Sequence, residues 1–456
     1  MKSIASSLCL LVFAAIGFNV EAARKPNIVF ILADDLGSYD VGWRGSKIKT
    51  PNLDRLCAQG AKLEQFYVQP VCSPTRSSLM TGRYPMRYGL QVGVVRPWAN
   101  YGLPLEERTL PQALRDAGYS TAMCGKWHLG SFDKAYWPNA RGFDYWYGHL
   151  MGALDYFTHI RDGKLDWYRN GEPNHDQGYS TFLVGEEAAR VIRDQPKDKP
   201  LFLYVPFNAV HDPLEVPAEY AKAYPEMTGD RRTYAGMVTA LDDMVGKIVA
   251  AVGESGLRKD TLFIFASDNG GPQPHRVTSN GPLRGGKFTL YEGGVHTCAF
   301  ATWDGHIKAG STVNALMHMV DWYPTLLKLG GASLKQKLPL DGKDMWASIA
   351  KGKPSPRTEV LCNAAPGTGA IRVGDWKLVI NGSKRDTDEE SAEKKGNNKR
   401  GAEQKIELFN LAEDPYEKSN LVETKPEKLQ ALLNRYQSYA SEAVVPKNQI
   451  GKSPSP

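Results

Sequence analysis

Cysteine is scarce in this chain. Six of its 456 residues are cysteines, and Cys9 lies within an apolar run near the N-terminus. The other five are an odd number, and their spacing matches no zinc-binding motif. At least one of them therefore lies outside any internal disulfide, and the fold does not depend on a disulfide framework. The sequence leaves open whether Cys57, Cys124, Cys298 and Cys362 form disulfides or stay reduced.

Dense basic runs are also missing. The formal net charge is +6 and 23% of the residues are charged, a mildly basic balance that is compatible with anionic substrates. No recognised nucleic-acid-binding module accompanies this charge, so we expect no nucleic-acid partner.

One apolar segment stands at the N-terminus. A basic start at Lys2, a short apolar run and small residues around Ala22 are typical of a secretory signal peptide. We expect residues 1–22 to be this signal peptide. The run is too short for a comfortable transmembrane helix, and no later segment is long and apolar enough to span a bilayer. The mature protein is therefore expected to be exported, periplasmic or secreted, without a membrane anchor.

Four continuous apolar stretches each end in polar residues. They lie within residues 25–37, 119–130, 200–213 and 260–271. Continuous rather than alternating apolar strands are typical of a parallel sheet that is covered on both faces. Helical patterns at 109–118 and 234–256 lie between them. We therefore expect an α/β fold with an open, doubly wound, mostly parallel sheet.

The polar residues that follow these strands are expected at one edge of the sheet, because ligands bind outside the carboxyl ends of such strands. One crevice should then hold Asp34, Asp35, Lys126, His128, His211, Asp268 and Asn269. The Asp34–Asp35 pair alone is also compatible with a helix cap or a turn. Together, three carboxylates and an amide are hard oxygen donors, which suit Ca²⁺ or Mg²⁺ better than zinc. We expect Ca²⁺ in an exported protein.

Cys72 lies at the start of a predicted helix. Pro74 suits the first position of that helix, which places Cys72 at the positive end of its dipole. Arg76 follows four residues later on the same helix face. An isolated cysteine is more often a packing residue, and a thiolate nucleophile is the next alternative. An oxygen nucleophile would match a hard cation better than a thiolate does.

The residues around Cys72 resemble a family signature. Cys-x-Pro-x-Arg, followed by Ser-Ser-Leu-Met-Thr-Gly-Arg-Tyr-Pro, is similar to the signature of the formylglycine-dependent sulfatases of the alkaline phosphatase superfamily. Further motifs that resemble this family lie within 27–37, 50–56, 125–130, 210–220, 267–271, 282–295, 372–379 and 407–421. Residues 40–45, 141–148 and 210–217 most resemble the arylsulfatase B (N-acetylgalactosamine-4-sulfatase) branch and its microbial polysaccharide-sulfatase relatives.

The resemblance implies how the reaction would run. A formylglycine-generating enzyme would oxidise Cys72 to formylglycine, and the hydrate of that aldehyde would attack sulfur. Arg76 would stabilise the hydrate. His128 would act as base on its second hydroxyl, and His211 would protonate the leaving alcohol.

The resemblance also implies the ligands of the site. Lys126 and Lys287 would hold the sulfate oxygens. One Ca²⁺ would be held by Asp34, Asp35, the modified Cys72, Asp268 and Asn269. The implied substrate is a sulfated oligo- or polysaccharide with 4-O-sulfate on galactose or N-acetylgalactosamine, as in chondroitin, dermatan or carrageenan-type glycans. Two alternatives remain, a phosphonate or phosphate monoester hydrolase and, if Cys72 is unmodified, a non-catalytic glycan-binding protein.

The chain is expected to have two ordered parts. Residues 23–350 would form the catalytic α/β domain, and a Pro- and Lys-rich linker near 351–357 would begin a C-terminal subdomain, an antiparallel sheet plus a helix, over 351–445. Residues 382–405 carry many charges and almost no apolar side chains, which predicts a flexible loop. Residues 446–456 are expected to be a disordered tail.

Aromatic residues gather between residues 136 and 168. We expect most of them to pack beneath the active-site loops and one or two to contact a sugar. His149 and His159 are further candidates for the mouth of the substrate site.

Overall fold

A ten-stranded sheet forms the frame of the computed structural model, which describes residues 25–273, 277–365, 367–383 and 404–449. The strand order is β13-β2-β12-β11-β1-β10-β4-β5-β8-β9. These strands are β1 (Asn27–Ala33), β2 (Ala61–Leu63), β4 (Ser120–Lys126), β5 (Tyr145–His149), β8 (Tyr168–Arg169), β9 (Glu172–Pro173), β10 (Leu201–Pro206), β11 (Thr261–Ser267), β12 (Ala299–Thr302) and β13 (Ser311–Val313). The predicted signal peptide lies outside the described residues.

The centre of the sheet is parallel. Strand β1 pairs in parallel with both β10 and β11, β10 pairs with β4, and β4 pairs with β5. Strand β12 runs antiparallel to β11. The four apolar stretches of the sequence are therefore neighbouring strands, and the predicted mostly parallel α/β sheet is confirmed.

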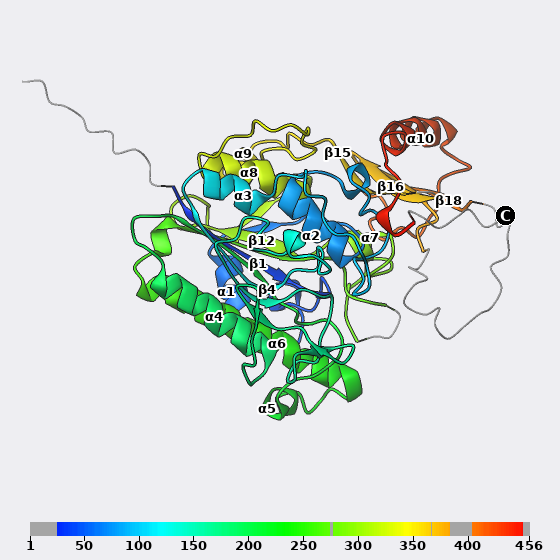
Figure 1. Ribbon diagram of the computed structural model, residues 1–456. Helices are drawn as coiled ribbons and strands as arrows, with labels where there is room; N and C mark the ends of the chain where they lie inside the picture. Colours follow the sequence, from blue (N-terminus) through cyan, green and yellow to red (C-terminus); the bar gives the residue numbers. More distant parts are fainter. Residues whose placement is uncertain (1–24, 274–276, 366, 384–403, 450–456) are drawn as a thin grey trace, which may run out of the picture.

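Helices cover both faces of this sheet (Figure 1). They are α1 (Pro51–Ala58), α2 (Cys72–Thr81), α3 (Leu110–Asp116), α4 (Ser180–Asp194), α5 (Ala218–Lys222), α6 (Gly229–Glu254), α7 (Glu292–Val295), α8 (Trp322–Leu329) and α9 (Trp346–Lys351). Val29 and Ile31 of β1 pack towards α1, α4 and α6, whereas Ile28 and Phe30 pack towards α2, α3 and α8. Alternate side chains thus enter two separate cores, which is why the strand is apolar throughout.

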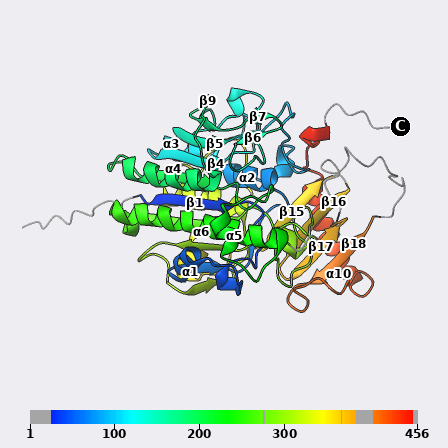
Figure 2. The same ribbon diagram turned by 90° about the horizontal axis from the view of Figure 1, so that it is seen from below.

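A second, four-stranded antiparallel sheet follows in the chain, as predicted. It contains β15 (Glu359–Ala365), β16 (Thr368–Val373), β17 (Trp376–Ile380) and β18 (Ile406–Asn410), and α10 (Pro426–Ala440) packs on it. Figure 2 shows this unit at one end of the large sheet. Most of the predicted loop 382–405 lies outside the described residues.

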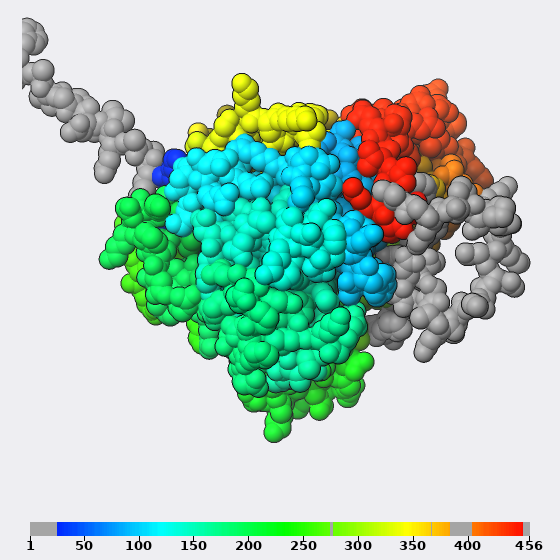
Figure 3. Space-filling view, viewed as in Figure 1, coloured from blue at the N-terminus to red at the C-terminus, as the bar shows by residue number. Residues whose placement is uncertain are grey.

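The segment expected to be a linker ends at an anchored arginine. Arg357 is buried, its Nε donates to Asp321 Oδ2 at 2.8 Å, and its Nη1 donates to the hydroxyl of Tyr84 at 2.9 Å. Within the predicted tail, the structure describes residues up to 449, and Lys447–Gln449 form a short 3-10 helix. Lys447 N donates to Gly89 O at 2.8 Å, which places this short helix against the N-terminal third of the chain (Figure 3).

The second sheet and the chain that follows it contact the segment 284–292 through ion pairs and hydrogen bonds. Lys377 of β17 is fully buried, and its Nζ lies 2.8 Å from carboxylate oxygens of both Glu292 and Glu417. Arg284 donates to Glu417 O at 3.0 Å and stacks over the ring of Tyr291. Buried charges are stable when they are paired in this way, so the second sheet meets α7 and the loop before it through a charged contact.

The smaller elements include the two-stranded pair of β3 (Phe66–Tyr67) with β14 (Met317–His318), and the hairpin of β6 (Ile160–Arg161) with β7 (Lys164–Leu165). Cys57, Cys72, Cys124, Cys298 and Cys362 are all buried and free. In the described part of the chain, no helix combines enough length and apolarity to cross a bilayer.

Candidate active site

The polar residues that follow the central strands lie together at one edge of the sheet. Asp34 and Asp35 follow β1, Lys126 ends β4, and Asp268 follows β11. His211 lies five residues beyond the end of β10. Asp35 N donates to Asp268 Oδ1 at 3.2 Å, which ties neighbouring strand ends to each other. The crevice inferred from strand polarity is present in the structure.

Cys72 lies at the floor of this crevice. Helix α2 begins at Cys72 itself, two residues before the Pro74 start that we predicted, because Val71 is the last extended residue. The thiol is 1% exposed and lies 3.3 Å from Asp34 Oδ1. Burial, and then the charges of Asp268 and Asp34, raise the pKa of the thiol well above its usual value. The unmodified residue is therefore a thiol, so this environment argues against a thiolate nucleophile.

Arg76 joins three parts of the site. It is fully buried, and its Nε and Nη2 donate to Asp268 Oδ2 at 3.1 and 2.8 Å. Its Nη1 donates to Lys126 O at 3.0 Å, and Nη2 lies 3.7 Å from Asp34 Oδ1. Two guanidinium nitrogens that donate to one carboxylate oxygen fix orientation as well as charge. Arg76 thus sets the relative positions of the ends of β1, β4 and β11.

Two lysines approach the carboxylates. Lys126 Nζ contacts Asp34, and Lys287 Nζ lies 2.9 Å from Asp35 Oδ2. Burial opposes ionisation of Asp35, but the charge of Lys287, the nearby imidazole of His211 and the hydrogen bonds from Asn269 and Lys287 outweigh it and hold the pKa of Asp35 below its usual value. Asp35 is therefore a carboxylate with the ammonium group of Lys287 beside it, in a site that would also attract a bound anion.

The oxygen donors fit a divalent cation. Ligand atoms of Asp34, Asp35, Cys72 and His211 all lie within 4.8 Å of one another. Asn269 Nδ2 donates to Asp35 Oδ1 at 2.7 Å, while Asn269 Oδ1 is buried without a hydrogen-bond partner. A buried orphan oxygen beside two carboxylates is what a hard cation would satisfy.

Asp268 is placed differently from the other predicted ligands. Its Oδ2 faces Arg76, and its Oδ1 accepts from the backbone of Asp35. Burial, followed by the negative charge of Asp34, raises the pKa of Asp268 to about 6. A carboxyl group whose pKa is raised by a neighbouring carboxylate is stabilised as an anion by a cation that both share.

Both predicted catalytic histidines are uncharged in this environment. His211 Nδ1 lies 2.7 Å from the carbonyl of Asp212, which can only accept, so Nδ1 carries the proton and Nε2 accepts from Lys287 at 3.1 Å. Burial and then Lys287 lower the pKa of His211 to about 4. Burial, then Lys126 and Arg76, lower the pKa of His128 well below its usual value.

A glycine makes room for His128. A Cβ on Gly152 would lie 2.5 Å from His128 Cε1. His128 itself has a left-handed backbone, with φ of 58°, a conformation that needs support from its surroundings. That support includes Ser73 Oγ, which donates to His128 O at 2.9 Å. Asp166 accepts from the backbone N–H groups of Leu150 and Met151 and so holds the strand end before Gly152.

We expect Gly152→Ala to impair the site without unfolding the chain. The new methyl group would displace the imidazole of His128 by a few tenths of an ångström or more, since it cannot occupy 2.5 Å from a ring carbon. Sulfate-ester turnover should fall by about 10²-fold, because catalysis is sensitive to small misplacements. Matched kcat and thermal unfolding measurements test this. Gly305→Ala is the control because a Cβ there meets nothing within 4 Å, although its positive φ adds some strain.

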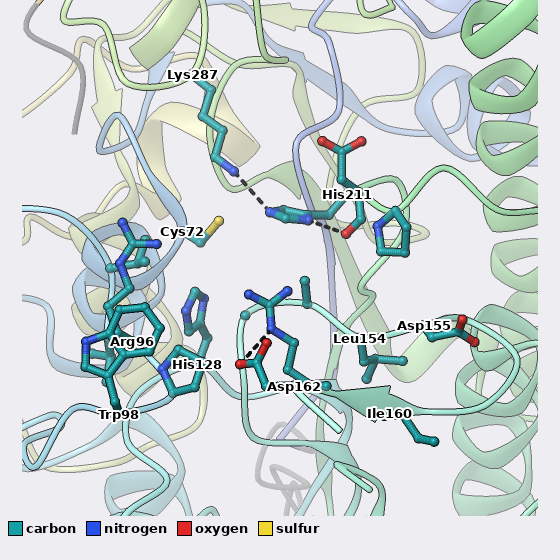
Figure 4. A pocket seen from close by; sticks show the side chains of 18 residues that line it. Cys72, Arg96, Trp98, His128, Leu154, Asp155, Ile160, Asp162, His211 and Lys287 are labelled. Carbon is teal, nitrogen blue, oxygen red and sulfur yellow. Dashed lines mark hydrogen bonds and ion pairs between the residues drawn. The ribbon is translucent and has the colours of Figure 1, made fainter. Parts of the chain in front are cut away.

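The site opens into a cavity of about 740 Å³ (Figure 4). Cys72, His128, His211 and Lys287 lie at its inner end. The outer walls are residues 94–98, 152–155, 160–162 and 212–213. The sequence did not predict that Arg96 and Trp98 line these walls, because no periodicity or motif marks them.

The expectations for the aromatic segment are corrected in part. His149 and His159 are buried and both stack on Trp167, so neither lines the cavity mouth. Trp146 and Tyr147 are buried in the two cores. These side chains support the loops from below, as expected for most of the segment.

Comparison with known proteins identifies the family. The model of the sulfatase family matches residues 26–332. Arylsulfatase J of Mus musculus is 39% identical, over 92% of this chain and 76% of its own. Arylsulfatase A of Homo sapiens is 36% identical, over 92% and 88%. N-acetylgalactosamine-6-sulfatase of Mus musculus is 35% identical, over 76% and 71%.

A solved structure is similar over nearly the whole chain. The structure of Ps i-CgsB in complex with k-i-k-neocarrahexaose has a TM-score of 0.82 and 31% identity, and the similarity covers 93% of this chain and 94% of that one. The chain therefore belongs to the sulfatase family and is a sulfuric ester hydrolase. The resemblance found in the sequence is confirmed at the level of the family.

Proposed function

We propose that this protein is an exported sulfatase that removes sulfate from a sulfated glycan, with 4-O-sulfate on galactose or N-acetylgalactosamine as its substrate. The observation that carries the proposal is the placement of Cys72 between two lysines and two histidines at the inner end of an open cavity. The names of the relatives and the saccharide bound to Ps i-CgsB support a glycan.

Two groups would complete the site. Cys72 would be oxidised to formylglycine by a formylglycine-generating enzyme, and its hydrate supplies an oxygen nucleophile. A divalent cation, Ca²⁺ in an exported protein, would be held by Asp34, Asp35, Asp268, Asn269 and the modified Cys72, and it supplies charge stabilisation for sulfate oxygens. The unpartnered Asn269 Oδ1 supports this ligand set.

The residues of the chain would then share the work of binding. Lys126 and Lys287 already contact Asp34 and Asp35. Their ammonium groups would also stabilise the sulfate oxygens on which negative charge develops. Arg76, which is fixed by Asp268, would hold the position of residue 72 at the start of α2. Preorganised charges of this kind need little rearrangement as the sulfur–oxygen bond breaks.

The two histidines would move protons. His128 is held uncharged and its buried Nδ1 has no partner, so it can accept a proton from a hydroxyl at position 72. His211 Nε2 faces Lys287, whose charge contributes to its low pKa. A bound sulfate would offset that charge and raise the pKa of His211, which favours its protonated form for donation to the leaving oxygen.

We expect His211→Ala to separate two kinds of substrate. Sugar sulfates release a poor alkoxide and need a proton, whereas aryl sulfates release a stable phenolate. The substitution should slow sugar-sulfate hydrolysis by about 10²–10⁴-fold and aryl-sulfate hydrolysis much less. Equal losses of kcat on the two substrates would contradict the role of His211 as the acid.

Anion release from a defined panel tests the function itself. The panel holds galactose and N-acetylgalactosamine units sulfated at O4 or O6, an aryl sulfate and a phosphate monoester, with protein whose Cys72 peptide has the formylglycine mass. Release from the O4 esters alone is the expected result. Release from the O6 esters would overturn the proposed position, and phosphate release without sulfate release would overturn the proposed substrate class. Detection of the mature N-terminus after residue 22 tests export.

A further inference from the structure

Trp98 is exposed at the rim of the cavity. It is 74% exposed and is one of the residues that line the cavity. A large aromatic ring left in water at the edge of a binding site is available as a flat apolar surface. Figure 4 shows Trp98 beside Arg96, on the opposite side of the cavity from His211 and Asp155.

The turn that carries Trp98 is anchored at both ends. Val95 and Ala99 are only 5% and 7% exposed, and Ala99 N donates to Arg96 O at 2.9 Å. Val95 N donates to Ser73 Oγ at 3.0 Å, and Ser73 Oγ in turn donates to His128 O. The exposed ring therefore sits on a turn whose backbone is tied directly to the residue after Cys72, so the place of this turn relative to the reaction centre is fixed.

The opposite wall of the cavity carries both an apolar side chain and charged side chains. Ile160 is 44% exposed and begins the hairpin of β6 and β7, whose next residue, Arg161, pairs with Asp162 at 3.4 Å. Asp155 N donates to Ile160 O at 3.0 Å, and this bond joins the two segments that form the wall. One wall of the cavity thus presents the indole of Trp98 together with Arg96. The other wall presents the aliphatic side chain of Ile160 together with an arginine.

We propose that Trp98 and Arg96 form a second sugar subsite, which binds the glycan unit next to the one whose sulfate is removed. The proposal rests on the glycan substrate proposed above. The C–H face of a sugar ring would stack on the indole, because this apolar face matches an aromatic surface. Arg96 would receive an anionic group of that unit, a sulfate or a carboxylate, for which a guanidinium has the right geometry. The enzyme would therefore select a chain of at least two units.

Binding to protein that cannot turn over tests the subsite. Calorimetry is done on Cys72→Ala protein with a disaccharide in which a 4-O-sulfated galactose is linked to a unit that carries a sulfate or a carboxylate, and with the matching 4-O-sulfated monosaccharide. Trp98→Ala in this background should weaken disaccharide binding by about tenfold, as for an aromatic anchor at an interface. Monosaccharide binding should change much less, and Trp98→Phe should restore most of the disaccharide affinity. Arg96→Gln should weaken the disaccharide selectively as well.

Phe132→Ala is the matched control. Phe132 is 49% exposed but packs beside Tyr136 and does not line the cavity, so its loss should leave the ratio of the two affinities unchanged. Disaccharide binding that Trp98→Ala leaves unaltered, or that falls equally with monosaccharide binding, would overturn the subsite alone. Failure of Cys72→Ala protein to bind either saccharide, while the unsubstituted enzyme hydrolyses an aryl sulfate, would overturn the glycan substrate as well.

Discussion

Cys72→Ser is expected to stop turnover after one chemical event. A serine hydroxyl could still attack sulfur, but it lacks the second hydroxyl whose deprotonation expels the sulfate. Steady-state sulfate release should fall by at least about 10⁴-fold, as for the loss of a nucleophile in other hydrolases. Mass spectrometry of the peptide that contains residue 72 should then show a stable sulfate ester after incubation with substrate.

A buried cysteine elsewhere provides the control. Cys57 is also buried and free, and it lies in α1, in the core on the other face of the sheet. Cys57→Ala removes a thiol of the same kind and should keep kcat within about twofold, with a modest loss of stability from the small cavity. Full activity of Cys72→Ser, or an equal loss in Cys57→Ala, would contradict the assignment of Cys72 as the reacting residue.

Lys377→Met is expected to destabilise the protein strongly. It would leave Glu292 and Glu417 buried, 2.8 Å from where the ammonium had been, with much of their counter-charge gone. Breaking a buried ion pair by removing one partner costs about 3–5 kcal/mol. Thermal and denaturant unfolding of the pure protein would measure the loss. Sulfate hydrolysis should fall too. Glu292 lies just after the loop that carries Lys287, so a displaced Glu292 would also displace Lys287 in the site.

Glu417→Gln is the companion variant. Burial raises the pKa of Glu417 to about 7, against the opposing charge of Lys377. The amide removes one carboxylate but leaves the Lys377–Glu292 pair intact. The cost should therefore be much smaller than for Lys377→Met. Because glutamine has nearly the same volume as glutamate, an equal loss of stability in the two variants would contradict the idea that the charge of Lys377 dominates this contact.

The sequence allowed the central fold and most of the crevice to be predicted, for a physical reason. A parallel strand buried on both faces must be apolar until it reaches the sheet edge, so the first polar residues mark that edge. Asp34, Lys126 and Asp268 were placed in this way, although each is far from the others in the chain. The start of α2 was misplaced by two residues because proline tolerates several positions in a first turn.

Contacts between loops could not be predicted. Gly152 is required by the ring of His128, which reaches it only after β4 and β5 have paired. Lys377 reads as an ordinary solvated lysine, because its partner Glu292 is 85 residues away in sequence. Nor does any pattern distinguish Trp98 from a surface tryptophan. Such positions are defined by tertiary packing rather than by local preference.

The charged contact between the second sheet and α7 has a consequence for exchanging parts between sulfatases. The family match ends at residue 332, yet the counter-charge for Glu292 comes from Lys377, beyond that boundary. A chain cut there would retain every residue proposed for catalysis. It would lose the Lys377–Glu292 ion pair that stabilises the chain just after the loop of Lys287. A chimera that took its second sheet from a relative would inherit catalytic efficiency only if the incoming strand carried a buried cation at the same place.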